Sequence, residues 1–248
     1  MNKGFYEVYI RHVQDIIARV IDQQSDNIQA AADRIADAIA AGNTIFAFGC
    51  SHAGILVEEL FYRTGGLALI NPIFNSTLML NTRPVTLTSR MERLEGFGAE
   101  IIRNSPVKAG DVLLIHSVSG RNPASVDAAL EGKKLGLYVI TLTNLTYSKQ
   151  VASRHSSGKN LYQVADLVID NCGDFEDSAI SIQGVDQKIA PTSTTVGALI
   201  VNSIVVETVA RLVDKGITPP VFHSANVDGG DEANRRIFEN YKDRIHYL

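Results

Sequence analysis

The chain of 248 residues has no tryptophan, three methionines and only two cysteines, Cys50 and Cys172. Two cysteines are too few for a disulfide scaffold or for a zinc site built from several thiolates. The sequence also lacks an excess of positive charge, because 23 Lys and Arg stand against 27 Asp and Glu. A nucleic-acid coat needs such an excess, so we expect no nucleic acid as a partner.

Long hydrophobic runs are also missing from the sequence. No apolar run approaches the roughly 20 residues of a membrane span. The N-terminal segment MNKGFYEVYIRHVQD has no signal-peptide core, since polar residues occur throughout it. These two absences predict a cytoplasmic protein without a membrane partner.

Short apolar runs alternate with segments of helical periodicity over most of the chain. The periodicity predicts helices at 52–63, 123–135 and 194–213, and another in MERLEGFGAEII that ends near Gly98 before a short strand over 100–103. The main strands are expected at 44–48, 67–70, 111–117, 137–143 and 166–171. This alternation is typical of α/β proteins, so we predict a doubly wound, mostly parallel five-stranded sheet.

The two ends of the chain lie outside this alternation. Residues 1–42 have the apolar spacing of helices, with Ser25 as an N-cap or a kink, and they pack on the domain or on a partner subunit. The main domain is predicted over 43–215. A tail over 216–248 contains two prolines, a Gly/Asp cluster and a short helix at about 232–241. The apolar stripes before the first strand argue against a monomer.

Polar loops follow two of the predicted strands, Gly49–Gly54 after the first and Ser117–Asn122 after the third. Each loop leads into a helix, whose free N–H groups and dipole favour an anion. Ligands of doubly wound sheets bind beyond these strand ends. A third hydroxyl cluster, 191–195, begins the late helix. Each cluster alone could be an ordinary N-cap, but three together favour a phosphate site.

Two common nucleotide sites do not fit these loops. A dinucleotide fingerprint needs glycines where the chain has Ala47 and His52. A P-loop needs a lysine and a hydroxyl where the chain has Ile55 and Leu56. We therefore expect no redox or other cofactor.

The loops resemble those of the sugar isomerase (SIS) domain family, which binds phosphosugars. The family's G-x-G-x-S loop is similar to Ala47-Phe48-Gly49-Cys50-Ser51, with the first glycine replaced, and its S-x-S-G-x-T loop is similar to 117–122, with Asn122 in the Thr position. The segments FYRTGGL, RHSSGK, PTST and SANVDGGDE resemble a subgroup of bacterial SIS-domain proteins labelled phosphosugar-binding or phosphoheptose-isomerase-like. The resemblance covers about 28–213 and implies a flavodoxin-like sheet and a homodimer or homotetramer with sites near subunit boundaries.

Carried over by this resemblance, the phosphate would be held by the small and hydroxyl residues Gly49, Ser51, Ser117, Ser119, Gly120, Asn122, Ser193 and Thr194. Arg154 or Lys159, in the polar loop after the fourth strand, would offset phosphate charge. The run from His223 to Asp231 would fold over a site, which could be a neighbour's. It could equally be a turn before a helix with Asp231 as N-cap.

Isomerisation of an aldose and a ketose needs a base between C1 and C2 and a group that opens the ring. Glu59 is the preferred base, although helical phase does not separate it from Glu58. Glu92 is a second candidate, with Glu95 three residues later on one predicted helix face; a solvated face is the alternative. His52 or His155 would help to open the ring, and a solvated basic loop is the alternative for His155.

No spacing in the sequence indicates a metal site, although zinc bound by His52, His155 and His223 stays possible. Buried positions are expected for Cys50 and for His116. The function predicted is a sugar-phosphate aldose–ketose isomerase that uses acid/base chemistry. The alternatives are a non-catalytic phosphosugar sensor, and a lyase or deaminase acting on an amino-sugar phosphate. The sequence does not identify the sugar.

Overall fold

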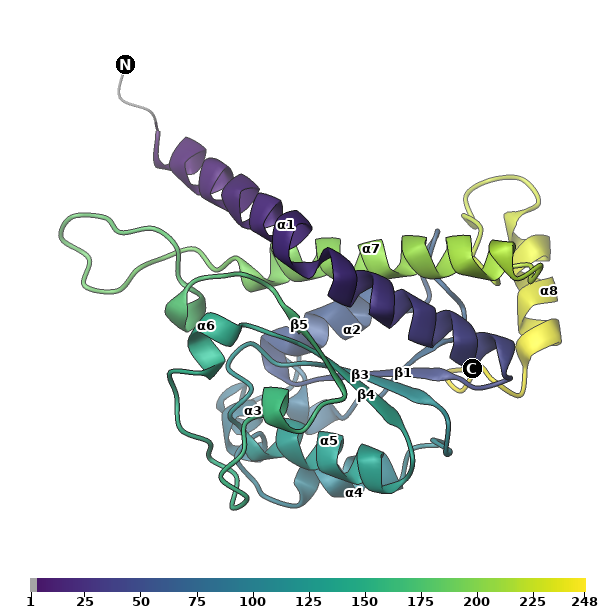
Figure 1. Ribbon diagram of the computed structural model, residues 1–248, viewed down its shortest axis with the longest axis horizontal. Helices are drawn as coiled ribbons and strands as arrows, with labels where there is room; N and C mark the ends of the chain where they lie inside the picture. The colour runs from purple at the N-terminus through teal and green to yellow at the C-terminus, as the bar shows by residue number, and fades with distance from the viewer. Residues whose placement is uncertain (1–3) are drawn as a thin grey trace.

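A parallel sheet of five strands forms the centre of the computed structural model, which describes residues 4–248 (Figure 1). Its strand order is β2-β1-β3-β4-β5. The strands are β1 (Ile45–Gly49), β2 (Ile70–Pro72), β3 (Val112–His116), β4 (Tyr138–Thr143) and β5 (Leu167–Asp170). The predicted α/β class, strand number and parallel pairing are confirmed.

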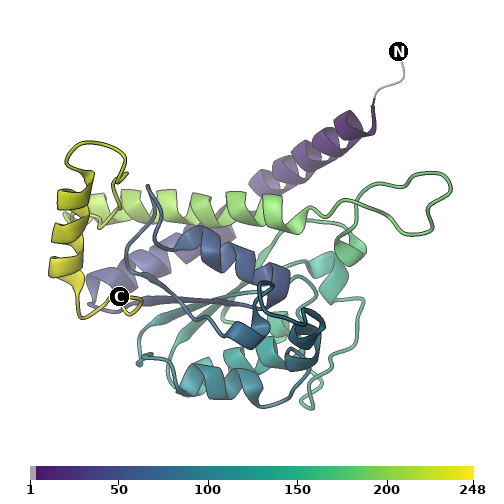
Figure 2. The same ribbon diagram turned by 180° about the vertical axis from the view of Figure 1, so that it is seen from behind.

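Helices cover both faces of the sheet. On one face lie α1 (Phe5–Ala40), α2 (Ile55–Leu60) and α7 (Ser193–Asp214), and on the other lie α4 (Phe97–Arg103) and α5 (Pro123–Lys134) (Figures 1 and 2). In β3, Leu114 points to the first layer while Leu113 and Ile115 point to the second. Strands buried on both faces appear in sequence as continuous apolar runs, which is why the predictions of β1, β3 and β4 hold.

The N-terminal segment forms a single helix. α1 runs for 36 residues without interruption and its N-cap is Gly4, so the predicted N-cap at Ser25 is wrong. The later part of α1 packs on α7 and the sheet, where Ile35 and Ile39 are buried. Its N-terminal part projects beyond the sheet (Figure 1). Several apolar side chains of this projecting part are exposed, including Phe5, Tyr6 and Ile10.

α7 is a core helix of unusual length and apolarity. Among residues 4–248 it alone is long and apolar enough to cross a membrane by length and composition. The expectation that no run approaches a span's length is therefore wrong for this segment. In the structure α7 packs against α1 and α2, and Val196, Ile200 and Ile204 are buried in the core.

The region between β2 and β3 differs most from the prediction. β2 begins at Ile70, where the expected strand ends, and Leu67 instead forms an antiparallel bridge with Val221. The helix expected from Met91 to about Gly98 is wrong, because α3 (Thr86–Met91) ends where it should begin and α4 begins only at Phe97. The predicted strand over 100–103 is wrong as well, because these residues belong to α4. Gly96 has a φ of 85°, which breaks the helix before α4. α4 then packs so closely on α5 that a Cβ on Gly98 would lie 1.9 Å from the Ala124 carbonyl oxygen.

Short elements complete the chain: α6 (Leu145–Ser148) and the 3₁₀ turns η1 (Ser51–Gly54), η2 (Ser76–Leu78), η3 (Leu161–Gln163) and η4 (Phe175–Asp177). The tail ends in α8 (Gly230–Tyr241). Gly229 rather than Asp231 is its N-cap, and Asp231 lies in its first turn. α8 packs across the C-terminal end of α7 (Figure 1).

Candidate functional site

The carboxyl ends of β1 and β3 lie side by side, because Gly49 pairs in register with His116. The loops that follow these strands therefore begin at the same edge of the sheet. In open α/β sheets this edge binds the ligand. The two polar loops singled out in the sequence are brought together here.

The loop after β1 turns sharply over the strand end. A Cβ on Gly49 would lie 2.6 Å from the Ala53 carbonyl oxygen, so a larger residue would displace η1. Cys50 is buried, as expected, and burial raises the pKa of its thiol, which makes it a poor nucleophile. Ser51 has a φ of 51° and its Oγ donates to Glu92 Oε1 at 2.5 Å.

Glu92 connects the two loops. Its second oxygen, Oε2, accepts a hydrogen bond from Asn122 Nδ2 at 2.7 Å, and Asn122 Oδ1 accepts one from an Arg154 guanidinium nitrogen at 2.9 Å. Since α3 ends at Met91, Glu92 and Glu95 lie in the turn after the helix, and the prediction of a shared helix face is wrong. Ser51 and Asn122, expected to hold phosphate, thus hold a carboxylate of the chain in this structure.

The loop after β3 leaves its donors free. The backbone N–H groups of Ser119–Asn122 and the hydroxyls of Ser117 and Ser119 have no hydrogen-bond acceptor within residues 4–248. Gly120 has a φ of 61°, and the helix α5 begins directly afterwards at Pro123. Successive N–H groups at a helix N-terminus form a concave site for an anion. We call residues 117–122 the anion loop.

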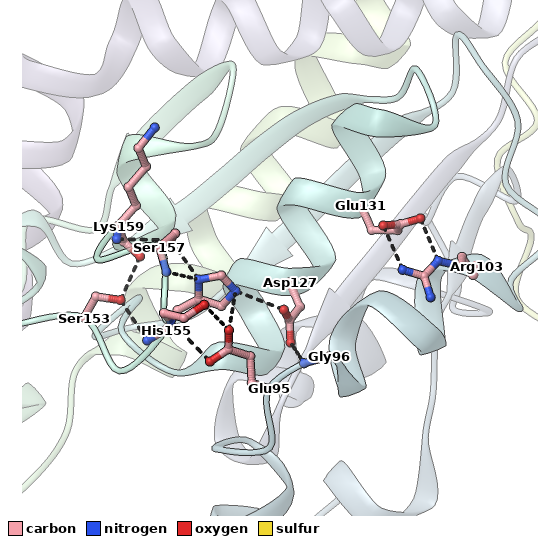
Figure 3. A network of polar contacts seen from close by, with 10 residues as sticks. Glu95, Gly96, Arg103, Asp127, Glu131, Ser153, His155, Ser157 and Lys159 are labelled. Carbon is pink, nitrogen blue, oxygen red and sulfur yellow. Dashed lines mark hydrogen bonds and ion pairs between the residues drawn. The ribbon is translucent and has the colours of Figure 1, made fainter.

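His155 is held in a polar network beside these loops (Figure 3). Its Nδ1 accepts a hydrogen bond from the Ser157 backbone N–H at 3.0 Å, so the ring proton is on Nε2. Nε2 donates to Asp127 Oδ1 at 3.1 Å, and Ser157 Oγ lies 2.7 Å from Nδ1. The His155 and Asp127 side chains are each 8% exposed. The solvated-loop alternative does not describe this histidine.

Two further sets of contacts hold His155 and Asp127 in place. Glu95 accepts hydrogen bonds from the Ser156 hydroxyl and, at 3.2 Å, from the Ser156 backbone N–H. Asp127 Oδ2 accepts from the Gly96 N–H at 2.7 Å. Sequence analysis did not find Asp127, although a carboxylate among the alanines of an otherwise apolar helix face was the available signal. Figure 3 also shows that the Glu131–Arg103 ion pair lies farther along α5, away from His155.

The two carboxylates of α2 point in different directions. Glu59 accepts a hydrogen bond from Asn202 Nδ2 on α7 at 2.8 Å and pairs with Arg63. Glu58 instead lines a cavity of about 190 Å³ together with Ser51. The remaining lining is contributed mainly by the segment around η2, from Phe74 to Asn81. The geometry therefore favours Glu58 over Glu59 as the α2 carboxylate near the strand ends.

The third hydroxyl cluster is capped by the chain itself. Asp177 Oδ2 accepts from Ser193 Oγ at 2.5 Å, and its Oδ1 accepts from the backbone N–H groups of Thr192 and Ser193. Thr194 is half-buried. The start of α7 is thus capped by Asp177 of another segment, and the N-cap residue Thr192 makes no side-chain cap hydrogen bond of its own.

His116 lies under the loop after β1. It is 3% exposed, and its Nδ1 lies 3.0 Å from the Ala53 carbonyl oxygen, whereas Nε2 has no partner within residues 4–248. Burial is the main cause that lowers the pKa of His116 to about 4, against 6.5 for a free imidazole. The ring is therefore neutral and connects β3 to η1.

Three predicted site residues lie apart from the network. His52 and Lys159 are exposed and make no side-chain hydrogen bond within the described part of the chain. His223 lines a separate cavity of about 290 Å³ with Tyr62 and Phe238, beside α8. No three His, Cys, Asp or Glu side chains in residues 4–248 are arranged to hold a metal ion, and His52, His155 and His223 do not meet.

A comparison with known sequences identifies one family, over a region that contains the loops after β1 and β3. A family model described as SIS domain matches residues 8–144. A UPF0309 protein of Shouchella clausii is 50% identical over 99% of this chain and 100% of its own length. One of Oceanobacillus iheyensis is 49% identical over 98% of this chain and 99% of its own.

Comparison with solved structures gives the same architecture. A phosphoheptose isomerase from Francisella tularensis superposes with a TM-score of 0.53 at 15% identity, over 82% of this chain and 95% of that one. The phosphoheptose isomerase GmhA from Neisseria gonorrhoeae superposes with a TM-score of 0.52 at 14% identity, over 85% and 97%. At these identities the similarity establishes the fold.

Proposed function

Because the chain belongs to the SIS domain family, we propose that it binds a sugar phosphate at the carboxyl ends of β1 and β3 and interconverts its aldose and ketose forms. The solved relatives of the same fold are phosphoheptose isomerases, and that activity is a property of those proteins. For this chain, the proposal depends on the anion loop and on the carboxylate beside it.

The free donors of the anion loop are the observation that carries the proposal. They comprise the N–H groups of Ser119–Asn122 and the hydroxyls of Ser117 and Ser119, next to the start of α5. A phosphoryl group has three strong acceptor oxygens, which these donors and the helix dipole would satisfy. A sugar phosphate would place its phosphoryl group here and direct its carbon chain toward Glu92.

Glu92 is the base in this proposal. Its carboxylate oxygens are oriented by Ser51 and Asn122, one residue from each loop. In the reaction, the carboxylate would take the proton from C2 of the aldose and return it to C1, so that no net proton is consumed. Glu58, which shares the cavity at Ser51, is the second carboxylate close enough to take part.

His155 would help to open the sugar ring through the Ser157 hydroxyl. Asp127 keeps the proton on Nε2, which leaves Nδ1 as an acceptor facing Ser157 Oγ. A proton would pass from the anomeric hydroxyl to Ser157 and from Ser157 to His155 as the bond between C1 and the ring oxygen breaks, and the ring oxygen would take a proton from solvent. Asp127 would be a positioning residue, since it touches His155 and not the substrate.

A second copy of the chain would cover an apolar groove on the α1–α7 face, at a distance from the anion loop. The groove has a volume of about 610 Å³ and is lined by Val20, Ile21 and Ile28 of α1 and by Leu199 and Val206 of α7. Ile21 is 64% exposed and Val206 is 67% exposed. Burying such a stripe would stabilise a homo-oligomer, which light scattering tests directly.

Thermal unfolding in the presence of C5–C7 sugar phosphates and amino-sugar phosphates tests the proposal. A ligand that binds only the folded state stabilises it by about 2.7 kcal/mol at 100 times its Kd. We expect one sugar phosphate to stabilise the protein well beyond inorganic phosphate or the free sugar, and then to exchange its C2 proton with solvent in D₂O. Binding without exchange would indicate a sensor, and elimination or ammonia release would indicate a lyase or deaminase. No stabilisation by any sugar phosphate would contradict the proposal.

A further inference from the structure

Three arginines surround the junction of the anion loop and the His155 loop. Arg121 belongs to the anion loop, Arg93 follows Glu92, and Arg154 precedes His155. The Arg154 backbone N–H donates to the Arg121 carbonyl at 2.9 Å, and its guanidinium donates to Asn122 Oδ1. Arg154 therefore contacts the anion loop, and the hydrogen bond between Glu92 and Asn122 brings Arg93, the residue after Glu92, to the same loop.

These arginines have no acidic partners of their own. None of the three forms an ion pair within residues 4–248. Arg121 Nε is shielded from solvent and has no acceptor within the same residues. Burial, and then repulsion by Arg121 and Arg93, lower the pKa of Arg154, which agrees with a cluster of like charges. Tyr147 and Glu92 are the opposing groups, and both Glu92 oxygens are already engaged.

The anion loop has enough donors for a phosphoryl group without these side chains. The three terminal oxygens of a phosphate monoester accept roughly six hydrogen bonds. The N–H groups of Ser119–Asn122 and the hydroxyls of Ser117 and Ser119 supply about that number of donors, by the same count. The guanidinium groups are additional, and guanidinium groups pair in a bidentate manner with carboxylate and phosphate.

We propose that Arg93, Arg121 and Arg154 bind a second anionic group of the same substrate, so that the substrate class is a sugar phosphate with an additional carboxylate or phosphate. The inference rests on the proposed function, because it takes the first phosphoryl group to lie in the anion loop. It goes beyond that function because it predicts that the monophosphate of a neutral sugar binds more weakly than a sugar phosphate with a second anionic group.

The test compares the Kd values of three probes by calorimetry at one ionic strength. Fructose 6-phosphate carries one anionic group, 6-phosphogluconate adds a carboxylate, and fructose 1,6-bisphosphate adds a phosphate. We expect at least one of the two doubly anionic probes to bind about tenfold more tightly than fructose 6-phosphate, the order of one charge-assisted pair. The probe that gains affinity identifies the second group as a carboxylate or a phosphate.

Two variants and a matched control locate the effect. Arg93→Gln should reduce the tenfold preference to about threefold or less while leaving the Kd of fructose 6-phosphate nearly unchanged, and Arg121→Gln should reduce the preference in the same way. Arg90→Gln removes the same charge from the exposed end of α3 and should leave the preference intact. Equal affinity for all three probes, or a preference that survives both variants, would overturn the inference but not the proposed function. Failure of all three probes to bind would contradict both.

Discussion

The loops after β1 and β3 have similar residues but different hydrogen bonding. In the β1 loop, Gly49 is covered by the Ala53 carbonyl, and the Ser51 hydroxyl is used by Glu92. In the anion loop, by contrast, the hydroxyls and four successive N–H groups remain without acceptors in the described residues. Similar glycine and serine patterns thus serve two purposes. One loop holds the Glu92 carboxylate, and the other keeps the free donors that the proposed function assigns to phosphate.

The difference follows from what each loop packs against. The β1 loop enters a 3₁₀ turn that faces the segment after α3, where Glu92 is available as an acceptor. The anion loop instead turns at Gly120 and leads into the free N-terminus of α5. A Cβ on that glycine would lie closest to side-chain atoms of Ser148, Leu161 and Thr143, and Thr143 Oγ1 donates to loop carbonyls rather than accepting from loop N–H groups.

The largest expected effect comes from removing the base. Glu92→Gln keeps the shape of the side chain but removes its ability to accept the C2 proton. We expect kcat to fall by about 10²–10⁴-fold, the usual size of a general-base contribution, with Kd changed by less than about threefold. Steady-state kinetics with the substrate found by the panel checks this. Glu239→Gln, on the exposed surface of α8, is the matched control and should be silent. A Glu92→Gln enzyme that retains full kcat would remove Glu92 from the mechanism.

The next test distinguishes the roles of the two loops. Ser119→Ala should weaken sugar-phosphate binding by about tenfold, since a hydrogen bond to a charged group contributes about 1.5–3 kcal/mol. Ser51→Ala should leave Kd nearly unchanged and lower kcat, because the Ser51 hydroxyl orients the Glu92 carboxylate and is not assigned to the phosphate. Calorimetry together with kinetics measures both. The reverse pattern, with binding lost in Ser51→Ala and kept in Ser119→Ala, would show that the assignment of the loops is wrong.

Asp127→Asn tests the orientation of His155. We expect kcat to fall by about tenfold with little change in KM, because the amide no longer favours a proton on Nε2 as a carboxylate does. The acid limb of the kcat–pH profile should also shift. Asp166→Asn, which affects a carboxylate paired with Lys133 at the other end of the sheet, is the comparison. An unchanged pH profile would mean that Asp127 has only a structural role.

The smallest expected effect concerns His116, which fixes the β1 loop to β3. Its pKa is about 4 in the folded protein and 6.5 when unperturbed, so the unfolded chain binds the proton more readily. Stability is therefore lost as pH falls from 6.5 toward 4, with no further loss from this group below that range. Between about pH 7.5 and 5.5 the loss should be about 1 kcal/mol.

Urea unfolding at the two pH values measures this loss. In His116→Gln the contribution of this group disappears, so the pH dependence should be shallower than in the wild type by about that amount. An identical pH dependence in the two proteins would mean that the imidazole is protonated as readily in the folded chain as in the unfolded one.

The fold could be predicted because its signals are local. β3 and β4 are buried on both faces, so their apolar runs identify them, and the alternation with α5 and α7 gives the parallel sheet. The turn between α3 and α4, where a helix is expected from the sequence, could not be predicted. It depends on Gly96 in a left-handed conformation and on the close packing of Gly98 against α5, a contact between segments distant in sequence.

The candidate site was predictable in its loops and not in its contacts. The glycine and hydroxyl pattern of 117–122 locates the anion loop from the sequence alone. The partner of Ser51, however, lies 41 residues away, and the partner of His155 lies 28 residues away. Glu58 and Glu59 are adjacent on one short helix, so only the position of Asn202 on α7 shows which of them turns away from the strand ends.

Phosphate binding to the anion loop is the step on which the proposed function depends. Titration of the ¹⁵N-labelled protein with the sugar phosphate selected by the panel tests it most directly, by following the amide signals of Ser119–Asn122. We expect these four amides to shift and saturate with one Kd, while the amides of Phe222–Asn234 in the α8 cavity stay unchanged. Saturable shifts confined to the α8 cavity, with the anion loop unaffected, would contradict the account.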